Sequence, residues 1–253
     1  MLLAVDVGNT HTVVGVYDGA DLRKSWRVSS DRSWTSTQVM IQLDQLLKLD
    51  GDVAGQIGES IISSVVPSLS HAWQKAICAV VGNPAHNVSA ANDYGMKVDY
   101  PNPREIGPDR IADAIAAVEK YGAPTIVVDL GTATNIEVID KTGSFVGGVI
   151  APGIQVSADA LFSSAARLAQ VDLRAPLHVV GKNTIEAVQS GLTYGEVARI
   201  DGLVAMIKRE LGYDAKVVAT GGLHSMIAPI SSTIDYRDPN LTLDGLRIIN
   251  DRL

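Results

Sequence analysis

The chain is poor in cysteine and in positive charge, and each shortage limits what it can be. Its 253 residues include a single cysteine, Cys78, so no internal disulfide can form. Lys and Arg number 21 against 28 Asp and Glu, which gives a formal net charge of -7. That balance argues against a nucleic-acid or anionic-membrane partner, because affinity for a phosphate backbone depends on clustered cations.

Long apolar runs and aromatic residues are scarce as well. No uninterrupted apolar stretch approaches the roughly 20 residues that cross a bilayer, and the strand-like start Leu2-Leu3-Ala4-Val5 does not resemble a signal peptide. We therefore expect a cytoplasmic protein. Two Phe and three Trp leave the core to Val, Ile, Leu and Ala, a composition typical of buried parallel strands covered by helices.

One local pattern occurs twice. Residues 3–19 read LAVDVGNTHTVVGVYDG, and residues 126–143 read IVVDLGTATNIEVIDKTG. Each is an apolar strand ending in Asp, followed by x-Gly, small polar residues and a second apolar strand. A single copy could be an ordinary hairpin, but Asp6 and Asp129 stand at the same offset from Gly, nearly half the chain apart. The repeat predicts a duplicated architecture.

The rest of the chain reads mainly as helices. Apolar spacings of three and four, with Gly and Pro as breaks, predict helices over 35–49, 69–81, 108–120 and 155–169, and one or two over 185–211. Strands are predicted over 61–66 and 216–220, and Gly221-Gly222 is expected to turn into a further helix. Three prolines make residues 99–110 a loop. Cys78 is expected to face the core from its helix.

The two hairpins suggest a phosphate site without a Walker lysine. No G-x-x-x-x-G-K-[ST] occurs, since Asn183 follows Gly181-Lys182. A glycine after a strand lets phosphate oxygens approach the turn, where backbone N–H groups and small polar side chains can donate to them. Asn9, Thr10 and Thr12 fit this role in the first copy, and Thr132, Thr134 and Asn135 fit it in the second. The two aspartates need a cation or water between themselves and phosphate.

Six short motifs follow one another along the chain. They are Asp6-Val-Gly-Asn-Thr10, Gly107-Pro-Asp-Arg110, Val128-Asp-Leu-Gly-Thr-Ala133, Gly147-Gly148 before Ala151-Pro-Gly153, Gly181-Lys-Asn-Thr184 and Ala219-Thr-Gly-Gly222. Together they closely resemble type III pantothenate kinase, a family of the acetate kinase, sugar kinase, Hsp70 and actin superfamily. The resemblance covers nearly the whole chain, and the motifs come in the family's order.

The resemblance implies an α/β fold of two actin-like, ribonuclease H-like domains, each a mixed β-sheet flanked by helices, with ATP in a cleft between them. We place these domains at residues 1–115 and 116–253. The family transfers the γ-phosphoryl group of ATP to the hydroxyl of pantothenate, which gives 4'-phosphopantothenate and begins coenzyme A biosynthesis. It also implies a homodimer, Mg²⁺ with the ATP, and a monovalent cation, K⁺ or NH₄⁺.

Individual residues receive roles from the same resemblance. The ATP-binding residues would be Asp6, Val7, Gly8, Asn9, Thr10, His11, Thr12, Val13 and Thr132. Asp6 would hold hydrated Mg²⁺, Asp129 would help hold the monovalent cation, and Gly221-Gly222 would be the adenosine motif. The pantothenate contacts would be Tyr100, Gly107, Pro108, Asp109, Arg110 and Thr184, the last reaching the neighbouring subunit's substrate. Asp109 would be the catalytic base, a task for which an ordinary carboxylate pKa suffices when the nucleophile loses its proton late.

Several of these residues also have ordinary structural interpretations. Asp109 could simply stabilise the dipole at a helix start, Arg110 could pair with Asp113, and Thr184 could cap the helix that follows it. Tyr100 could be a loop aromatic, and His11 reads as a polar loop residue rather than a catalyst.

Two other functions remain open on the sequence. One is a nucleotide-binding regulator like the Bvg accessory factors, and the other is a kinase for another small hydroxy acid or sugar. A regulator is expected to lose the base or the Pro-rich loop, whereas Asp109 and Tyr100 are both present here.

Overall fold

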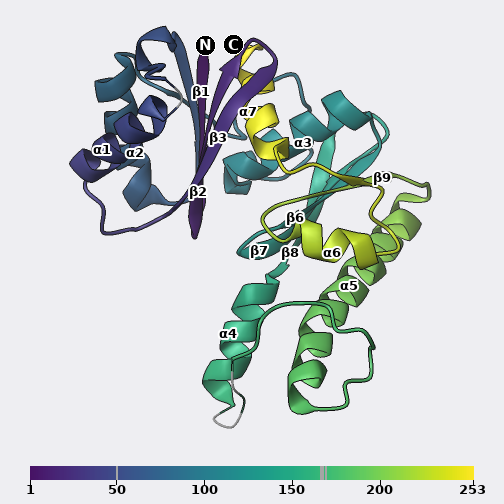
Figure 1. Cartoon of the computed structure of the whole chain (residues 1–253). Helices are drawn as coiled ribbons and strands as arrows, with labels where there is room; N and C mark the ends of the chain where they lie inside the picture. The colour runs from purple at the N-terminus through teal and green to yellow at the C-terminus, as the bar shows by residue number, and fades with distance from the viewer. Residues whose placement is uncertain (50, 166–167, 169) are drawn as a thin grey trace. The chain divides into compact units, whose positions relative to one another are not determined.

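The computed structural model describes residues 1–49, 51–165, 168 and 170–253. Two compact units account for them: Met1–Ala116 together with Asn240–Leu253, and Ala117–Pro239. Figure 1 labels most helices and strands of both. Among the described residues, no helix is both long enough and apolar enough to cross a membrane.

The first unit is built on a five-stranded mixed sheet. Its strands are β1 (Leu2–Val7), β2 (His11–Asp18), β3 (Asp21–Ser29), β4 (Glu59–Ser64) and β5 (His86–Asn87). They lie in the order β3-β2-β1-β4-β5, with β1, β2 and β3 antiparallel and β4 and β5 parallel to β1. The first phosphate loop is the connection between β1 and β2.

Helices cover both faces of this sheet. They are α1 (Ser36–Lys48), α2 (Pro67–Val81) and α7 (Leu241–Asn250). Helix α3 (Pro108–Tyr121) packs against α7 and continues into the second unit. The side chains of Val5 and Val14 belong to the core with α1 and α2. The next residue on β2, Gly15, faces α7, since a Cβ there would lie 2.9 Å from Leu243 Cδ1. The strand alternation therefore puts Asp6 on the face opposite α1 and α2.

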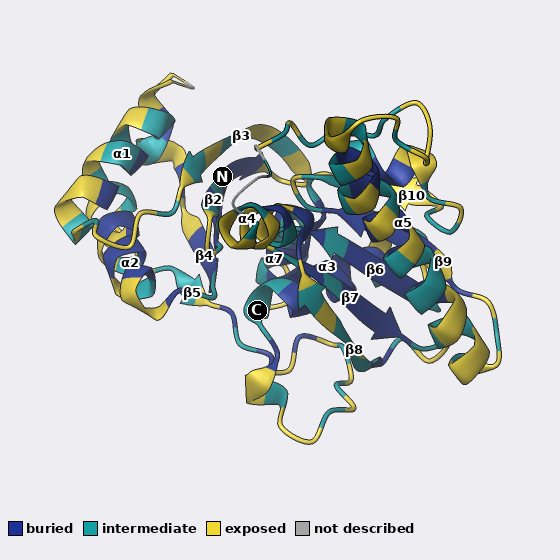
Figure 2. Cartoon of the chain, turned by 90° about the horizontal axis from the view of Figure 1, so that it is seen from below, coloured by how far each residue is buried: buried dark blue, intermediate teal, exposed yellow. Residues whose placement is uncertain are grey.

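The second unit repeats this plan. Its strands are β6 (Thr125–Leu130), β7 (Ala133–Ile139), β8 (Phe145–Pro152), β9 (Lys216–Thr220) and β10 (Tyr236–Arg237), and its helices are α4 (Ile154–Ser164), α5 (Thr184–Leu211) and α6 (His224–Ile227). The strand order is β10-β9-β6-β7-β8, with β6, β7 and β8 antiparallel and β9 and β10 parallel to their neighbours. Figure 2 shows β6 and β7 largely buried, while α1 and α5 have long exposed faces.

The two sheets match strand for strand. Asp6 pairs with Val13 on β2 and with Ser63 on β4, and Asp129 pairs with Asn135 on β7 and with Thr220 on β9. Each aspartate is the penultimate residue of its strand. The predicted duplication, with two mixed sheets flanked by helices, is confirmed.

Most predicted elements are present with shifted ends. The strand expected at 61–66 spans Glu59–Ser64, and the 185–211 region is one helix. The helix expected at 155–169 ends at Ser164, and residues 166, 167 and 169 of that prediction lie outside the described residues. The prediction for Cys78 was wrong. It is exposed, because α2 buries Leu69, Ala72, Trp73, Ala76 and Ile77 along a different stripe.

The two compact units and the expected domains at residues 1–115 and 116–253 place the last helix differently. Contacts assign Asn240–Leu253 to the first unit, where Tyr17 Oη donates to Asp244 Oδ1 at 2.7 Å and Asn250 Nδ2 donates to Glu59 Oε2 at 2.7 Å. Helix α7 thus supplies the second covering layer of the N-terminal sheet, a layer that residues 1–115 do not provide on their own.

Candidate functional site

The first phosphate loop is a tight turn held by backbone bonds. Gly8 N–H donates to His11 O at 3.0 Å, and Ser30 N–H donates to Thr10 O at 2.9 Å. A Cβ on Gly8 would lie 2.8 Å from His11 O, so only glycine fits this turn. Thr12 is 1% exposed, and its hydroxyl bonds to Ser30 Oγ at 2.9 Å. Asn9 is exposed and Thr10 follows it at the tip, which leaves the loop's own tip open to a ligand.

Two arginines from distant positions bond to side chains of this loop. Arg32 Nη2 donates to Asn9 Oδ1 at 2.9 Å, and Arg27 Nη2 lies 2.9 Å from His11 Nδ1. Burial and, secondarily, the Arg27 charge lower the pKa of His11, so the ring is neutral at physiological pH. The sequence reading missed both arginines because their pairing depends on β3 and the segment after it rather than on a local motif.

The second loop is also closed by a backbone bond from its glycine, but it is one residue shorter than the first, because Asp6 pairs with Val13 whereas Asp129 pairs with Asn135. Gly131 N–H donates to Ala133 O at 3.0 Å, and Thr132 is exposed. Gly153 N–H donates to Thr132 O at 3.1 Å, and a Cβ on Gly153 would approach Gly131 O to 2.6 Å. The glycine of the expected Ala151-Pro-Gly153 motif is therefore required for the segment after β8 to lie directly against the loop.

The expected adenosine motif lies against the end of β6. Leu223 N–H donates to Leu130 O at 3.2 Å. Gly221 has a φ of 82°, and a Cβ there would overlap Asp129 Oδ1 and lie 2.6 Å from Leu130 C. The structure thus brings Asp129, the Gly131–Thr132 loop and the Gly221–Leu223 turn together within the second unit.

Asp109 is half-buried in the first turn of α3. Arg110 N–H donates to its Oδ1 at 2.9 Å, and the Arg110 side chain is itself buried. Desolvation raises the pKa of Asp109, while the Arg110 N–H and the Arg110 charge oppose that rise. Burial thus disfavours the charged form of this carboxyl, as is common at catalytic sites.

Val65 joins the Asp109 segment to the first phosphate loop. Its N–H donates to Val7 O at 3.1 Å, and its Cγ1 would lie 3.5 Å from a Cβ on Gly107. A Cβ on Gly107 would also overlap the Asp109 carboxyl, so glycine there lets the carboxyl lie against the chain. The expected base thus stands beside the end of β1, close in the fold to the expected phosphate loop.

Two further expected substrate contacts lie before α3 and at the start of α5. Tyr100 is half-buried in the loop before α3, and the short helical turn Pro103–Glu105 follows it. Thr184 is exposed and is the first residue of α5. Asn183 caps this helix instead, since its Oδ1 accepts from Glu186 N–H at 2.9 Å. Helix capping therefore does not account for Thr184.

The donor sets suit the expected cations in different ways. Mg²⁺ in nucleotide sites is usually held through one or two carboxylates, waters and the phosphates themselves, and Asp6 at the end of β1 supplies such a carboxylate. The described residues hold no group of three or more His, Cys, Asp or Glu side chains placed to bind a metal. Around Asp129 a Cβ on Gly221 would overlap Oδ1, and a Cβ on Gly131 would lie 3.5 Å from both carboxylate oxygens, so the two glycines keep side chains away from this carboxylate.

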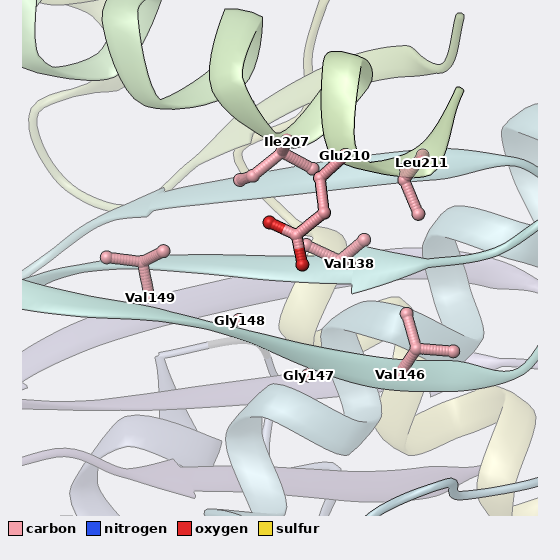
Figure 3. Close-up of a pocket in the computed structure, with 8 residues that line it drawn as sticks. All are labelled: Val138, Val146, Gly147, Gly148, Val149, Ile207, Glu210 and Leu211. Atoms are coloured by element: carbon pink, nitrogen blue, oxygen red, sulfur yellow. The ribbon is translucent and has the colours of Figure 1, made fainter. Parts of the chain in front are cut away.

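A surface hollow with a volume of about 180 Å³ lies elsewhere in the second unit (Figure 3). Valines of β7 and β8, the backbone of Gly147 and Gly148, and the last turns of α5 line it, with the Glu210 carboxylate lying over the strands. None of the expected site residues belongs to this lining. Apolar walls with one negative charge do not suit a polyphosphate.

Sequence reasoning also missed an ion pair on α5. Glu196 is 5% exposed, pairs with Arg199 and accepts from the hydroxyl of Thr134, which follows the second loop. A signal was present. The buried stripe of α5 is polar in its first half and apolar in its second. Its residues recur at helical spacing and include Gln189, Thr193, Glu196, Val197, Ile200 and Val204.

The chain is similar to known proteins over its full length. A family model described as type III pantothenate kinase matches residues 2–206. The chain is 43% identical over 252 residues to a type III pantothenate kinase of Anaeromyxobacter sp., covering 100% of this chain and 99% of that protein. It is 42% identical over 252 residues, with the same coverage, to a type III pantothenate kinase of Moorella thermoacetica.

Solved structures share the fold at low sequence identity. A Campylobacter jejuni chain described as a Baf family transcriptional activator superposes with a TM-score of 0.59 at 21% identity, covering 99% of this chain and 100% of that one. The ROK hexokinase of Thermus thermophilus gives 0.53 at 13% identity, covering 98% and 97%. These neighbours confirm the expected actin-like fold class. By the full-length match and the ordered motifs on its two loops, the chain belongs to the type III pantothenate kinase family.

Proposed function

We propose that this protein transfers the γ-phosphoryl group of ATP to the hydroxyl of pantothenate, the first step of coenzyme A biosynthesis. The observation that carries the proposal is the position of Asp109, whose segment contacts Val65 beside the end of β1 and the first phosphate loop. Full-length relatives named type III pantothenate kinase support the same reaction. Asp109 and Tyr100 are both present, and a purely regulatory relative would need neither the base nor the substrate contact.

The two loops divide the work of binding ATP. In the first loop, backbone N–H groups and the Asn9 and Thr10 side chains donate to phosphate oxygens, and Asp6 holds Mg²⁺ through water. In the second loop, the exposed Thr132 contacts ATP. When bound, the metal neutralises charge on the phosphates, and positioning supplies much of the rate. Asp129 helps to hold a monovalent cation, K⁺ or NH₄⁺, and the Gly221 turn accommodates adenosine.

Asp109 acts on the acceptor. Its carboxylate accepts a hydrogen bond from the pantothenate hydroxyl and takes the proton as the new P–O bond forms, while the bond between the γ-phosphorus and the bridging oxygen breaks and ADP leaves. The Arg110 N–H fixes the carboxyl through its bond to Oδ1. Arg110 and Tyr100 bind the substrate, and the guanidinium of Arg110 suits the carboxylate of pantothenate.

The assembly and location of the protein extend this proposal. We propose that the protein is a cytoplasmic homodimer in which Thr184 of one subunit reaches the substrate of the other. The exposure of Thr184 at the first turn of α5 is consistent with this contact, and light scattering of the purified protein tests the dimer.

The proposal is tested by ADP formation from ATP and pantothenate, with and without K⁺. Turnover should depend on pantothenate and should rise with K⁺. If the rate of ADP formation is the same with and without pantothenate, both in the presence and in the absence of K⁺, the substrate assignment is contradicted. A sugar or another hydroxy acid that replaces pantothenate with higher kcat/KM would favour a different kinase.

Asp109→Asn tests the base. Losing proton acceptance should lower kcat about a hundredfold or more. Desolvation disfavours the Asp109 charge, so an amide should leave stability at neutral pH unchanged or higher, as thermal unfolding will show. Asp44→Asn is the matched control, because the side chain of Asp44 on α1 is 41% exposed and pairs with Lys48 at 2.7 Å. An Asp109→Asn enzyme with a kcat like that of the control would show that Asp109 is not the base.

A further inference from the structure

The ion pair of α5 contacts the polypeptide around the second phosphate loop at two points. Thr134 Oγ1 donates to Glu196 Oε1 at 2.6 Å and accepts from Arg199 Nη2 at 3.3 Å. Arg199 Nη2 also pairs with Glu196 Oε2 and donates to Pro152 O at 2.7 Å. Thr134 is two residues after Thr132, and Pro152 precedes Gly153, which bonds to Thr132.

These contacts hold Thr132 from both sides. On one side the chain runs from Thr132 to Thr134, whose hydroxyl is fixed by Glu196 and Arg199. On the other side Gly153 N–H donates to Thr132 O at 3.1 Å, and the preceding carbonyl is fixed by Arg199. One ion pair on a long helix therefore fixes both segments that flank the exposed loop residue.

The burial of Glu196 argues for a specific task. Glu196 is 5% exposed and the Thr134 that donates to it is 2% exposed, whereas the side chain of Arg199 is 29% exposed. A carboxylate removed from water in an ion pair gains little stability over apolar residues of the same volume. Other buried polar groups on α5 bond elsewhere: Thr193 Oγ1 donates to Gln189 O of its own helix at 2.7 Å, and Gln189 and Ser190 donate to the carbonyls of Asp172 and Val179. Glu196 and Arg199 bond to the segments that flank the second loop.

We propose that Glu196 and Arg199 are positioning residues for ATP, which act through Thr134 and Pro152 to set the conformation of the Gly131–Ala133 loop. The proposal rests on the assignment of Thr132 as an ATP contact above. The pair does not touch the nucleotide. It removes alternative conformations of the loop, so ATP binds without a cost of ordering it.

Thr134→Val tests the proposal with a change of similar shape. It removes the hydroxyl that Glu196 and Arg199 share and should raise the KM for ATP, and its Kd measured by calorimetry with MgATP, by about tenfold. The KM for pantothenate should stay within about twofold of the wild type, because the substrate contacts of the first unit are untouched. Thr134→Ser keeps the hydroxyl and should restore ATP binding.

Thr193→Val is the matched control. It makes the same replacement at a fully buried threonine of α5 whose hydroxyl stays within the helix, so any general loss of packing should appear in both variants, and ATP binding should change only in Thr134→Val. Glu196→Gln supplies a second variant. Combined with Thr134→Val, it should give less than the sum of the two single effects, since both break one network.

The outcomes separate this proposal from the proposed function. Wild-type turnover of pantothenate, together with unchanged ATP binding in Thr134→Val, overturns the positioning role and leaves the kinase assignment standing. Wild-type MgATP binding without pantothenate turnover contradicts the kinase assignment, while weaker binding in Thr134→Val still supports the positioning role. Equal weakening in Thr134→Val and Thr193→Val, or no MgATP binding by the wild type, overturns the positioning role.

Discussion

At the scale of single residues, Asp109 is held between two opposing effects. Desolvation favours its neutral form, whereas the charge and N–H of Arg110 favour its ionised form. A protonated Asp109 cannot accept a proton, so activity falls as the pH drops through its pKa. Because that pKa is raised, the acid limb of the rate profile should lie above the range of an ordinary aspartate. The same sign means that the stability contribution of this group is lost as the pH rises through the folded pKa.

Replacing Arg110 should move the acid limb upward. Arg110→Met removes a positive charge that lowers the pKa of Asp109, while the backbone N–H to Oδ1 remains. The acid limb of kcat against pH, measured at saturating substrates, should therefore shift to higher pH. The KM for pantothenate should rise as well, because the guanidinium would no longer meet the substrate carboxylate.

Arg104→Met is the comparison for this shift. Arg104 is exposed in the short turn of the same Pro-rich loop, so its loss should leave the acid limb where it is in the wild type. A limb that stays in place in Arg110→Met, or moves to lower pH, would mean that the Arg110 charge does not act on Asp109.

Residue positions were predictable where the reason for them is local. Gly8 lies in the turn that requires a glycine, and the place of Asp6 near the end of β1 follows from the strand pattern. Arg32 could not be found in this way, because its bond to Asn9 Oδ1 joins residues 23 apart through the path of β3. The buried Glu196 left a trace in the α5 stripe, but its partner Thr134 is 62 positions away on another element.

At the scale of elements, one glycine decides how closely α7 approaches α3. A Cβ on Gly245 would overlap Ala112 O and lie 2.9 Å from Ala112 Cα. Ala112 is fully buried on α3, so the helix backbone has little freedom to yield. The approach of α7 to the first unit therefore depends on the absence of a side chain at this position.

Gly245→Ala should destabilise the protein despite the higher helix propensity of alanine. Separating the two helices should cost about 1–3 kcal/mol, as overpacking of a core does. Gly202→Ala is the contrasting change, since a Cβ there would meet nothing within 4 Å on α5, and it should stabilise by up to about 1 kcal/mol. Urea unfolding of both variants measures the difference. Equal gains in stability would show that α7 does not pack closely at Gly245.

The element boundaries show what apolar periodicity can and cannot predict. Helix α1 was expected at 35–49 and spans Ser36–Lys48, because Thr35 and Gln38 form a capping box that the sequence displays. Helix α7 buries Leu241, Leu243, Leu246, Ile248 and Ile249, yet no local signal tells which sheet a terminal helix will cover. Which sheet α7 covers depends on Gly15 and Gly245. Their lack of a side chain lets α7 approach only once the sheet has formed.

At the scale of the whole molecule, the first unit depends on the C-terminal segment Asn240–Leu253 for part of its core, and the second unit does not. The second unit contains its own core from Ile126 to Ile234, all within Ala117–Pro239. The first unit takes α7 from beyond that segment. The two halves share a strand order, but they differ in the number of chain segments that build them.

Deleting residues 240–253 should therefore unfold the first unit and spare the second. The deletion removes five buried apolar side chains at about 1.5–3 kcal/mol each, a total comparable to the about 5–15 kcal/mol that stabilises a typical domain. Hydrogen exchange should show loss of protection in β1, β2 and β4, with β6, β7 and β9 still protected. Deleting only the exposed residues 251–253 controls for shortening the chain and should leave every strand protected. Protection of β1 and β4 that survives the longer deletion would mean that the N-terminal sheet is stable without α7, and loss of protection in both sheets would mean that the two units unfold as one.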